Sequence, residues 1–248
     1  MSEPMHQCYL YPHTDCRRSP GSNDETHYVS QELVNAILSP HLARVLVQYH
    51  TENLVWYHNV LHTPTFLAQC NQFWDAGLVE HPQWVSVYCT VLSATAWSMV
   101  NTCSDSLPLD GLAQSMFDQA VSALYRDNFL ERHSIYALQA VCISGMVANV
   151  LGRSDLLTTL VNSAIRIAQC LGLHRVPDDE FPRTGGEQWR DALDREVGRR
   201  IWWKLVELDY HSMPYTGTLS RSCEDSQNWH WLTHLQPSIR EAFRQCSQ

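Results

Sequence analysis

One stretch of this chain, residues 135–151, is almost wholly apolar. Ala137, Leu138 and Val141 lie within it, and it contains no charged residue. A helix without a polar face has to be buried on most of its sides, so this stretch restricts the fold more than any other feature. Ser134 directly precedes the stretch, and a serine at that position is a typical N-terminal helix cap. The sequence therefore predicts a helix here that is buried on most sides.

Helix start signals recur along the chain. Ser39-Pro40 and Thr63-Pro64 each place a hydroxyl side chain before a proline at the first helical position. Gly77 can close the helix that follows Thr63-Pro64, because glycine readily adopts the left-handed conformation of a C-terminal cap. These signals predict two helices in the first third of the chain.

Further helical segments follow. Pro82 opens one, residues 110–125 form another, Ser154 or Asp155 caps a third, and a last helix runs over about residues 190–213. The apolar residues at helical spacing in all these segments are Leu42, Val45, Leu46, Tyr49, Phe66, Leu67, Cys70, Phe73, Val85, Tyr88, Cys89, Leu92, Ala96, Leu112, Met116, Ala120, Leu124, Leu157, Val161, Ile165, Ala168 and Leu171.

The fold predicted from these segments is all-α, with about seven or eight helices packed as successive antiparallel hairpins. No Asn-Gly or Asp-Gly turn joins two runs of alternating apolar and polar residues. Residues 28–218 are predicted to form the helical domain, with a surface loop over residues 177–186. Residues 1–27 are predicted to be a flexible leader, and residues 219–248 a divergent tail.

The charge balance argues against DNA as the direct partner of this chain. Its 26 acidic and 17 basic residues give a formal net charge of −9. DNA binding depends on lysine and arginine neutralising phosphates, and the densest basic groups are the pairs Arg17-Arg18 and Arg199-Arg200. We therefore expect no direct DNA binding by this chain.

The nine cysteines favour a reducing compartment, the cytosol or the nucleus. Their number is odd and their spacing irregular, which is not typical of a disulfide framework. Cys70, Cys89, Cys142 and Cys170 lie in apolar helical stretches, where a free thiol packs as a small hydrophobe. The N-terminus has no secretory signal pattern, and no stretch approaches the ~18 apolar residues of a membrane span.

Two histidine pairs have the spacing of metal ligands. His58 and His62 are four residues apart, as in zinc protease helices, but Asn59 occupies the position of the catalytic glutamate. Pro64 follows closely, so the segment is interpreted as a helix end. His230 and His234 repeat the spacing in the weakly periodic tail. Neither pair is predicted to hold a metal.

The remaining candidates for chemistry have structural interpretations. Asp178-Asp179-Glu180 is compared with magnesium-binding motifs, but these acids are consecutive and lie in a loop, where a solvated surface is expected. No Gly-rich phosphate loop or nucleophile elbow is present in the sequence. We expect no catalytic residue and no cofactor.

Three segments, in this order, resemble a known family. Residues 56–66 read Trp-Tyr-His-Asn-Val-Leu-His-Thr-Pro-Thr-Phe, and residues 164–175 end in Leu-Gly-Leu-His-Arg. Residues 196–209 carry Glu, Arg-Arg, Trp-Trp and Asp, with Pro-Tyr-Thr-Gly-Thr over residues 214–218. Together they resemble the middle homology region, the regulatory domain of fungal binuclear zinc-cluster transcription factors, over about residues 30–218.

The resemblance implies structural roles for the residues that carry it. These residues are His62, Pro64, Phe66, Gly172, His174, Arg175, Arg199, Arg200, Trp203 and Asp209. Gly172 suits a left-handed helix end that lets Leu173 fold back. We expect Arg166, Arg175, Arg199 and Arg200 to pair with Asp178, Asp179, Glu196 or Asp209 between adjacent helices.

The chain departs from the family pattern at both ends. Cys8 and Cys16 cannot supply the six thiolates of a binuclear zinc cluster, and the pattern stops near Leu219, as in a chain truncated at its C-terminus. The resemblance implies a nuclear regulatory domain that acts through a protein partner, such as a complete transcription factor or a second copy, or through a small effector. The alternative is a helical metal-dependent enzyme of fungal small-molecule metabolism, which requires acidic or histidine ligands converging in one cavity.

Overall fold

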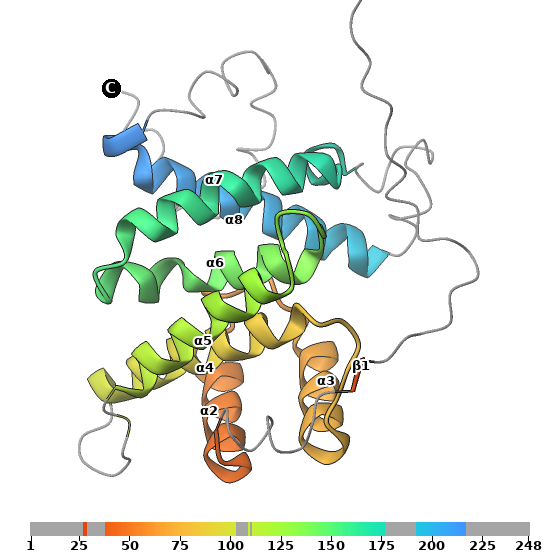
Figure 1. The fold of residues 1–248 in the computed structure, drawn as a ribbon, viewed down its shortest axis with the longest axis vertical. Coiled ribbons are helices and arrows are strands. Elements are labelled where there is room, and N and C mark those ends of the chain that lie inside the picture. Colours follow the sequence, from red (N-terminus) through yellow and green to blue (C-terminus); the bar gives the residue numbers. More distant parts are fainter. Residues whose placement is uncertain (1–26, 29–37, 103–108, 110, 177–191, 217–248) are drawn as a thin grey trace, which may run out of the picture.

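The structure, a computed structural model, describes residues 27–28, 38–102, 109, 111–176 and 192–216. These residues form seven α-helices, a short 3-10 helix and a two-residue strand pair, so the all-α prediction is confirmed (Figure 1). The helices are α2 (Pro40–Asn53), α3 (Thr63–Ala76), α4 (Trp84–Thr102), α5 (Leu112–Arg126), α6 (Ile135–Val150), α7 (Ser154–Cys170) and α8 (Ala192–Thr216), with the 3-10 helix η1 (Leu173–Arg175) after α7.

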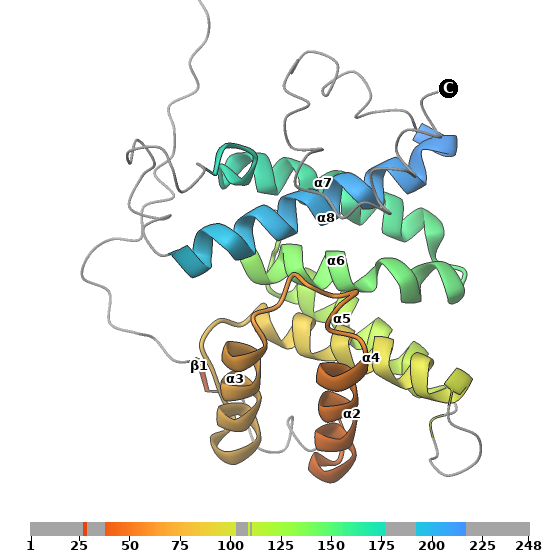
Figure 2. The same cartoon turned by 180° about the vertical axis from the view of Figure 1, so that it is seen from behind.

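The helices from α4 to α8 run in alternating directions, as the hairpin prediction requires (Figures 1 and 2). α6 lies between a layer formed by α4 and α5 and a layer formed by α7 and α8, and it packs against all four helices. α2 and α3 stand side by side across α4, and α2 packs against α4. None of the described helices is long and apolar enough to cross a bilayer.

The apolar helix α6 is buried around most of its circumference, as predicted. Its buried apolar side chains are Ala137, Leu138, Ala140, Val141, Cys142, Ile143, Val147 and Ala148. The Ser134 side chain accepts a hydrogen bond of 3.3 Å from the Ala137 N–H, so the predicted cap is also confirmed.

The other helix ends follow the sequence signals in part. α2 begins at Pro40 directly after Ser39, although the Ser39 side chain makes no capping hydrogen bond. The C-cap of α3 is Gly77, whose φ of 65° is left-handed as expected. The predicted cap of α7 is wrong, because the N-cap is Arg153 and both Ser154 and Asp155 lie in the first turn.

The early start of α7 has a local cause. Gly152, with a φ of 69°, turns the chain sharply after α6, and the Arg153 N–H still bonds to the Ala148 carbonyl at 2.8 Å. Helical backbone therefore resumes one residue earlier than the capping pattern indicates. Asp155 remains favourably placed, since a carboxylate near a helix N-terminus interacts well with its dipole.

A short strand pair was not predicted. β1 (His27–Tyr28) pairs antiparallel with β2 (Leu78–Val79), with His27 opposite Val79 and Tyr28 opposite Leu78. Two residues are too few to create an alternating pattern in the sequence. The predicted loop at residues 177–186, the tail at residues 219–248 and all of the predicted leader except His27 lie outside the described residues.

Three of the four cysteines expected in helical cores are buried, and one is not. Cys70, Cys89 and Cys142 are buried, whereas Cys170 is exposed at the last position of α7. Burial raises the pKa of all three core thiols, that of Cys89 to about 12. Protonated, enclosed thiols are poor nucleophiles, so these cysteines pack as hydrophobes.

A glycine marks the point where α6 and α8 approach each other. A Cβ added at Gly145 would lie 2.5 Å from Cδ2 of Leu208, a buried residue of α8. No L-amino acid with a side chain fits there unless Leu208 moves, so Gly145 leaves room for the Leu208 side chain where α8 packs on α6.

We predict that Gly145→Val lowers the free energy of unfolding by about 1–3 kcal/mol, the usual range for overpacking a core. Denaturant unfolding measures the change, with Asn149→Val, at an exposed position of the same helix, as the control. Leu208→Ala should lower the free energy of unfolding by less in the Gly145→Val background than in the wild type, because the smaller side chain relieves the clash. Strictly additive changes would show that residues 145 and 208 do not interact.

Candidate functional site

The three segments that resemble the family meet on α8. The third segment forms most of α8, the second comprises the end of α7 and η1, and the first comprises most of the connection between α2 and α3. We call residues 54–62 the crossover segment; Figure 2 shows it passing from α2 to α3 in front of the other helices. Side chains from α6 and α8 reach its backbone and rings.

Three contacts hold the crossover segment against the helices. The Gln139 Nε2 of α6 donates to the Val60 carbonyl at 2.9 Å, and the Arg200 Nη1 of α8 donates to the Asn59 carbonyl at 3.4 Å. The Lys204 ammonium of α8 lies 4.1 Å from the centroid of the Tyr57 ring, within cation–π range. Arg200 thus connects the first and third segments directly.

The second segment reaches α8 through aromatic packing. The His174 ring lies 5.7 Å from the Trp202 ring, centroid to centroid. The backbone of Gly172 is left-handed, with a φ of 79°, and Leu173 behind it is buried. Burial and the neighbouring Arg175 charge lower the pKa of His174. Arg175 itself is exposed at the end of η1.

The ion pairs differ from the expected pattern. Arg199 and Arg200 both contact the Glu196 carboxylate, at 3.1 and 2.7 Å, within α8 itself. Their spacing of three and four residues brings the side chains together on one helix face, so the prediction of pairing between adjacent helices is wrong for Glu196. Arg166 likewise donates to Gln169 of its own helix at 3.1 Å, while Asp178 and Asp179 lie outside the described residues.

The Glu196 carboxyl responds to both arginines. Partial burial acts to raise its pKa, but hydrogen bonds from Arg200 and Arg199 outweigh burial and lower the pKa below the usual value. Asp209, further along α8, is buried, and burial raises its pKa. Trp203 is half-buried on the same helix.

The His-x-Pro-x-Phe residues form the start of α3. His62 is the N-cap residue, and its Nδ1 lies 2.7 Å from the Thr65 hydroxyl. Pro64 occupies the first turn, and Phe66 is buried with its ring centroid 6.2 Å from that of Trp84. These three residues lie at the start of α3 and in its first turn.

The partner of His58 is His50, a residue that the sequence reasoning missed. The His50 Nε2 and the His58 Nδ1 lie 3.0 Å apart, and the planes of the two buried rings are within 6° of parallel. The His50 Nδ1 and the His58 Nε2 are buried without a hydrogen-bond partner. His50 stands four residues after Leu46 in the apolar stripe of α2, which was the available signal of its burial.

No metal site emerges from the described part of the chain. No group of three or more His, Cys, Asp or Glu side chains there could hold an ion, and His58 and His62 have separate partners. Cys8, Cys16, His230, His234 and residues 178–180 lie outside the described residues.

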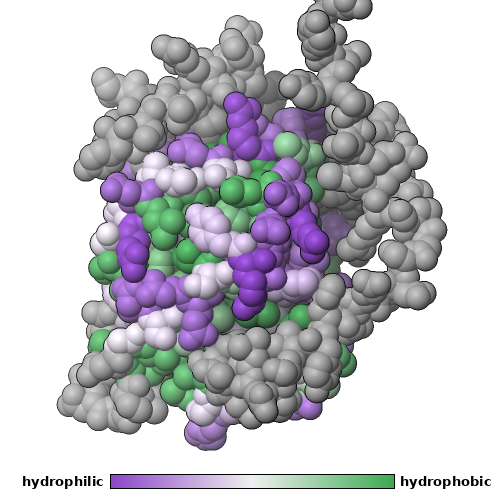
Figure 3. All heavy atoms as spheres, viewed as in Figure 1, coloured by the Kyte–Doolittle hydropathy of each residue, from purple (hydrophilic) through white to green (hydrophobic). Residues whose placement is uncertain are grey.

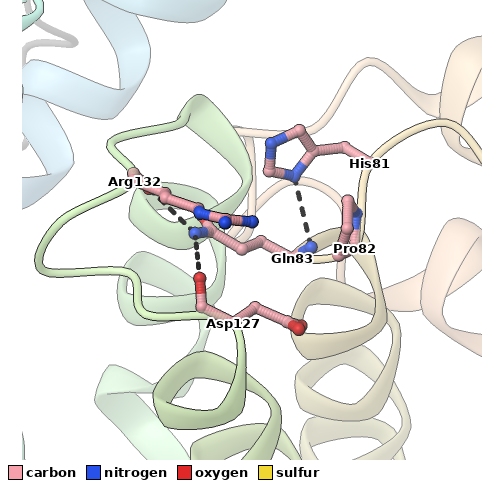
Figure 4. A pocket seen from close by; sticks show the side chains of 5 residues that line it. All are labelled: His81, Pro82, Gln83, Asp127 and Arg132. Carbon is pink, nitrogen blue, oxygen red and sulfur yellow. Dashed lines mark hydrogen bonds between the residues drawn. The ribbon is translucent and has the colours of Figure 1, made fainter. Parts of the chain in front are cut away.

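A small hollow of about 80 Å³ lies beside Gln83, between the start of α4 and the turn after α5 (Figure 4). The buried Gln83 amide donates to the carbonyls of Asp127 and Arg132 at 3.3 and 2.8 Å, and its Oε1 accepts from the Ser134 hydroxyl. His81 accepts a hydrogen bond from the Gln83 N–H at 3.2 Å. Gln83 therefore ties the turn after α5 to α4, which is a structural task.

Comparison with known proteins relates these segments to transcription regulators. A family model described as fungal specific transcription factor domain matches residues 48–227. An uncharacterized transcriptional regulatory protein of Schizosaccharomyces pombe is 29% identical over 164 residues, which cover 64% of this chain and 25% of that protein.

Two further relatives come from filamentous fungi. Transcription factor macR of Penicillium terrestre is 26% identical over 204 residues, covering 72% of this chain and 22% of that protein. Probable transcription factor lepB of Aspergillus flavus is 24% identical over 185 residues, covering 66% of this chain and 31% of that protein. The chain thus spans about a quarter of the length of the curated relatives it matches. No solved structure matches it.

The buried histidine pair predicts acid sensitivity. Burial lowers the pKa of His50 to about 4 and that of His58 to about 3, and the charges of His50 and Lys204 also lower the pKa of His58. Since unfolded histidines titrate near pH 6.5, the unfolded chain binds protons that the folded chain excludes, and stability falls as the pH drops from about 6.5 toward 4.

We expect the free energy of unfolding to fall by about 2–4 kcal/mol between pH 7 and pH 5 through these two groups. Denaturant unfolding at each pH measures the change. The double variant His50→Leu/His58→Leu should show a flatter dependence over this interval. If the free energy of unfolding changes equally with pH in the wild type and the double variant, the histidine pair is not the source of the acid sensitivity.

Gln83→Ala should lower the free energy of unfolding by about 2–3 kcal/mol, because two partly buried carbonyls and the Ser134 hydroxyl lose their partner. Thermal or denaturant unfolding measures the loss, with Gln72→Ala, at an exposed position of α3, as the control. Equal stability of the two variants would show that water replaces the amide without penalty.

Proposed function

Because the chain belongs to the fungal specific transcription factor domain family, we propose that it regulates transcription by binding other proteins. The proposed setting is the nucleus, and the proposed partners are a complete transcription factor or a second copy of this chain. Catalysis has no part in the proposal, and the comparisons offer no support for the metal-dependent enzyme considered from the sequence.

The observation that carries the proposal is the meeting of the three segments on α8. Arg200 and Lys204 contact the crossover segment, and Trp202 contacts His174 of η1. These contacts join helices and do not converge on a shared cavity, so we assign the motif residues to holding the domain in one arrangement. A domain held in one defined shape suits recognition by a partner, because less freedom is lost on binding.

The exposed surface also suits protein contacts. The face in Figure 3 presents apolar side chains interspersed with polar ones, a mixture that protein interfaces also have. Trp56 is 75% exposed, and its indole N–H donates to the Asn53 carbonyl at 2.8 Å. Tryptophans held in place at a surface are frequent centres of binding energy.

Direct DNA contact is a weaker candidate, and the hollow beside Gln83 is not a candidate effector site. At about 80 Å³, this hollow is below the ~300 Å³ at which ligand pockets begin. The net charge of −9 opposes association with a polyanion.

Tethering tests the proposal. Fused to an unrelated DNA-binding domain in a fungal host, the chain should change transcription of a matched reporter several-fold relative to the DNA-binding domain alone. Trp56→Ala should weaken the effect by removing an exposed contact while leaving the core intact, whereas Gln72→Ala, also at an exposed position, serves as the control.

Two results would contradict the proposal. One is a tethered, folded chain without any effect on the reporter. The other is salt-sensitive, sequence-specific DNA binding by the isolated chain, measured by filter binding at two salt concentrations, because that would make DNA the direct partner.

A further inference from the structure

We propose that the crossover segment, residues 54–62, is a releasable strap, which leaves its position on α6 and α8 while the helices stay folded. Release is a property of the fold and holds whether or not the chain regulates transcription. In the regulatory role proposed above, it provides a second conformation that a partner can select.

Within the described part of the chain, two side-chain hydrogen bonds and one cation–π contact hold the segment on α6 and α8. Val60 and Leu61 are its buried apolar side chains. Within the segment, the N–H groups of Tyr57 and His58 both donate to the Leu54 carbonyl, each at 3.0 Å. Helix ladders, by contrast, satisfy nearly every backbone group, so the segment can open at a lower free energy than the helices on which it lies.

The buried histidine pair favours opening. A single hydrogen bond joins the His50 Nε2 and the His58 Nδ1, and either ring can be the donor. In both arrangements, the two outer nitrogens comprise one N–H donor and one acceptor, and both are buried without a partner. Water reaches these atoms only when the segment lifts, so opening relieves a penalty that the closed state carries.

The Lys204 charge acts in the same direction. Lys204 of α8 is 7% exposed and pairs with Glu207 at 2.9 Å, and the Glu207 carboxylate opposes part of its effect. Other titratable groups on the packed elements include Tyr57 of the segment, Tyr49 and Glu52 of α2, Cys142 of α6 and Arg200 of α8, while α4 carries no charged residue. A proton on either histidine is enclosed away from water in the closed state, and one on His58 also lies near the Lys204 cation, so mild acid favours the open state.

Hydrogen exchange of the full chain tests the proposal. The Tyr57 and His58 amides report on the segment, and the amides of α4 and α6 report on global unfolding. We expect the segment amides to exchange at least tenfold faster than the α6 amides, with little dependence on low denaturant concentrations. If the segment amides and the amides of α4 and α6 exchange at the same rate and with the same dependence on denaturant, the proposal is overturned.

Variants separate release from ordinary fraying of a turn. Gln139→Ala removes the hydrogen bond to Val60 and should speed exchange of the segment amides about tenfold while leaving α4 amides unchanged. Gln119→Ala, at a half-buried position of α5, is the control and should change neither set. An equal effect of Gln139→Ala on both sets would overturn the proposal.

A double-mutant cycle on His50 and His58 tests the role of the pair. His50→Leu and His58→Leu should each speed segment exchange about tenfold, because each leaves a buried imidazole with no partner. The double variant should return to the wild-type rate or below it, and its exchange, corrected for intrinsic rates, should not rise between pH 7 and pH 5.5. A double variant faster than both single variants would exclude the pair as the cause of opening.

Discussion

The missing polar face of α6 is the constraint on which the rest of the structure depends. A helix of this composition gains most by being enclosed, and the chain encloses it between α4 and α5 on one side and α7 and α8 on the other. The alternating directions of these helices follow from covering one central helix with short connections. The three family segments then lie on the outer members of this arrangement.

Irregular backbone next to a core needs partners for its polar groups. The crossover segment lies in this position, and Gln139 and Arg200 supply hydrogen bonds to two of its carbonyls. Arg200, a motif residue of α8, therefore binds the backbone of this segment in the absence of any ligand. The contacts explain why segments far apart in the sequence form one unit in space.

The sequence was informative where one residue dictates local geometry. The all-α fold, the buried α6, the Ser134 cap and the left-handed Gly77 follow from apolar periodicity, a hydroxyl acceptor and a missing side chain. Partner choice could not be read in this way. Glu196 can meet an arginine on its own helix or on another, and only the three-dimensional packing decides.

The histidines illustrate the same limit. A spacing of four residues drew attention to His58 and His62, whereas the actual partner of His58 is His50, eight residues away. A helix end followed by a turn brings these two rings together, and no fixed period encodes that geometry. Likewise, the strand pair of β1 and β2 joins residues about fifty positions apart through two residues each.

Gly145 has a consequence beyond its own contact with Leu208. Leu208 lies on the same helix as Lys204 and Arg200, about one and two turns away from them, and these cations contact the crossover segment. A Cβ added at Gly145 meets the end of the Leu208 side chain, so either Leu208 takes another rotamer or α8 shifts on α6. Core volume at this one position therefore bears on the seating of α8, the helix from which the crossover segment is held.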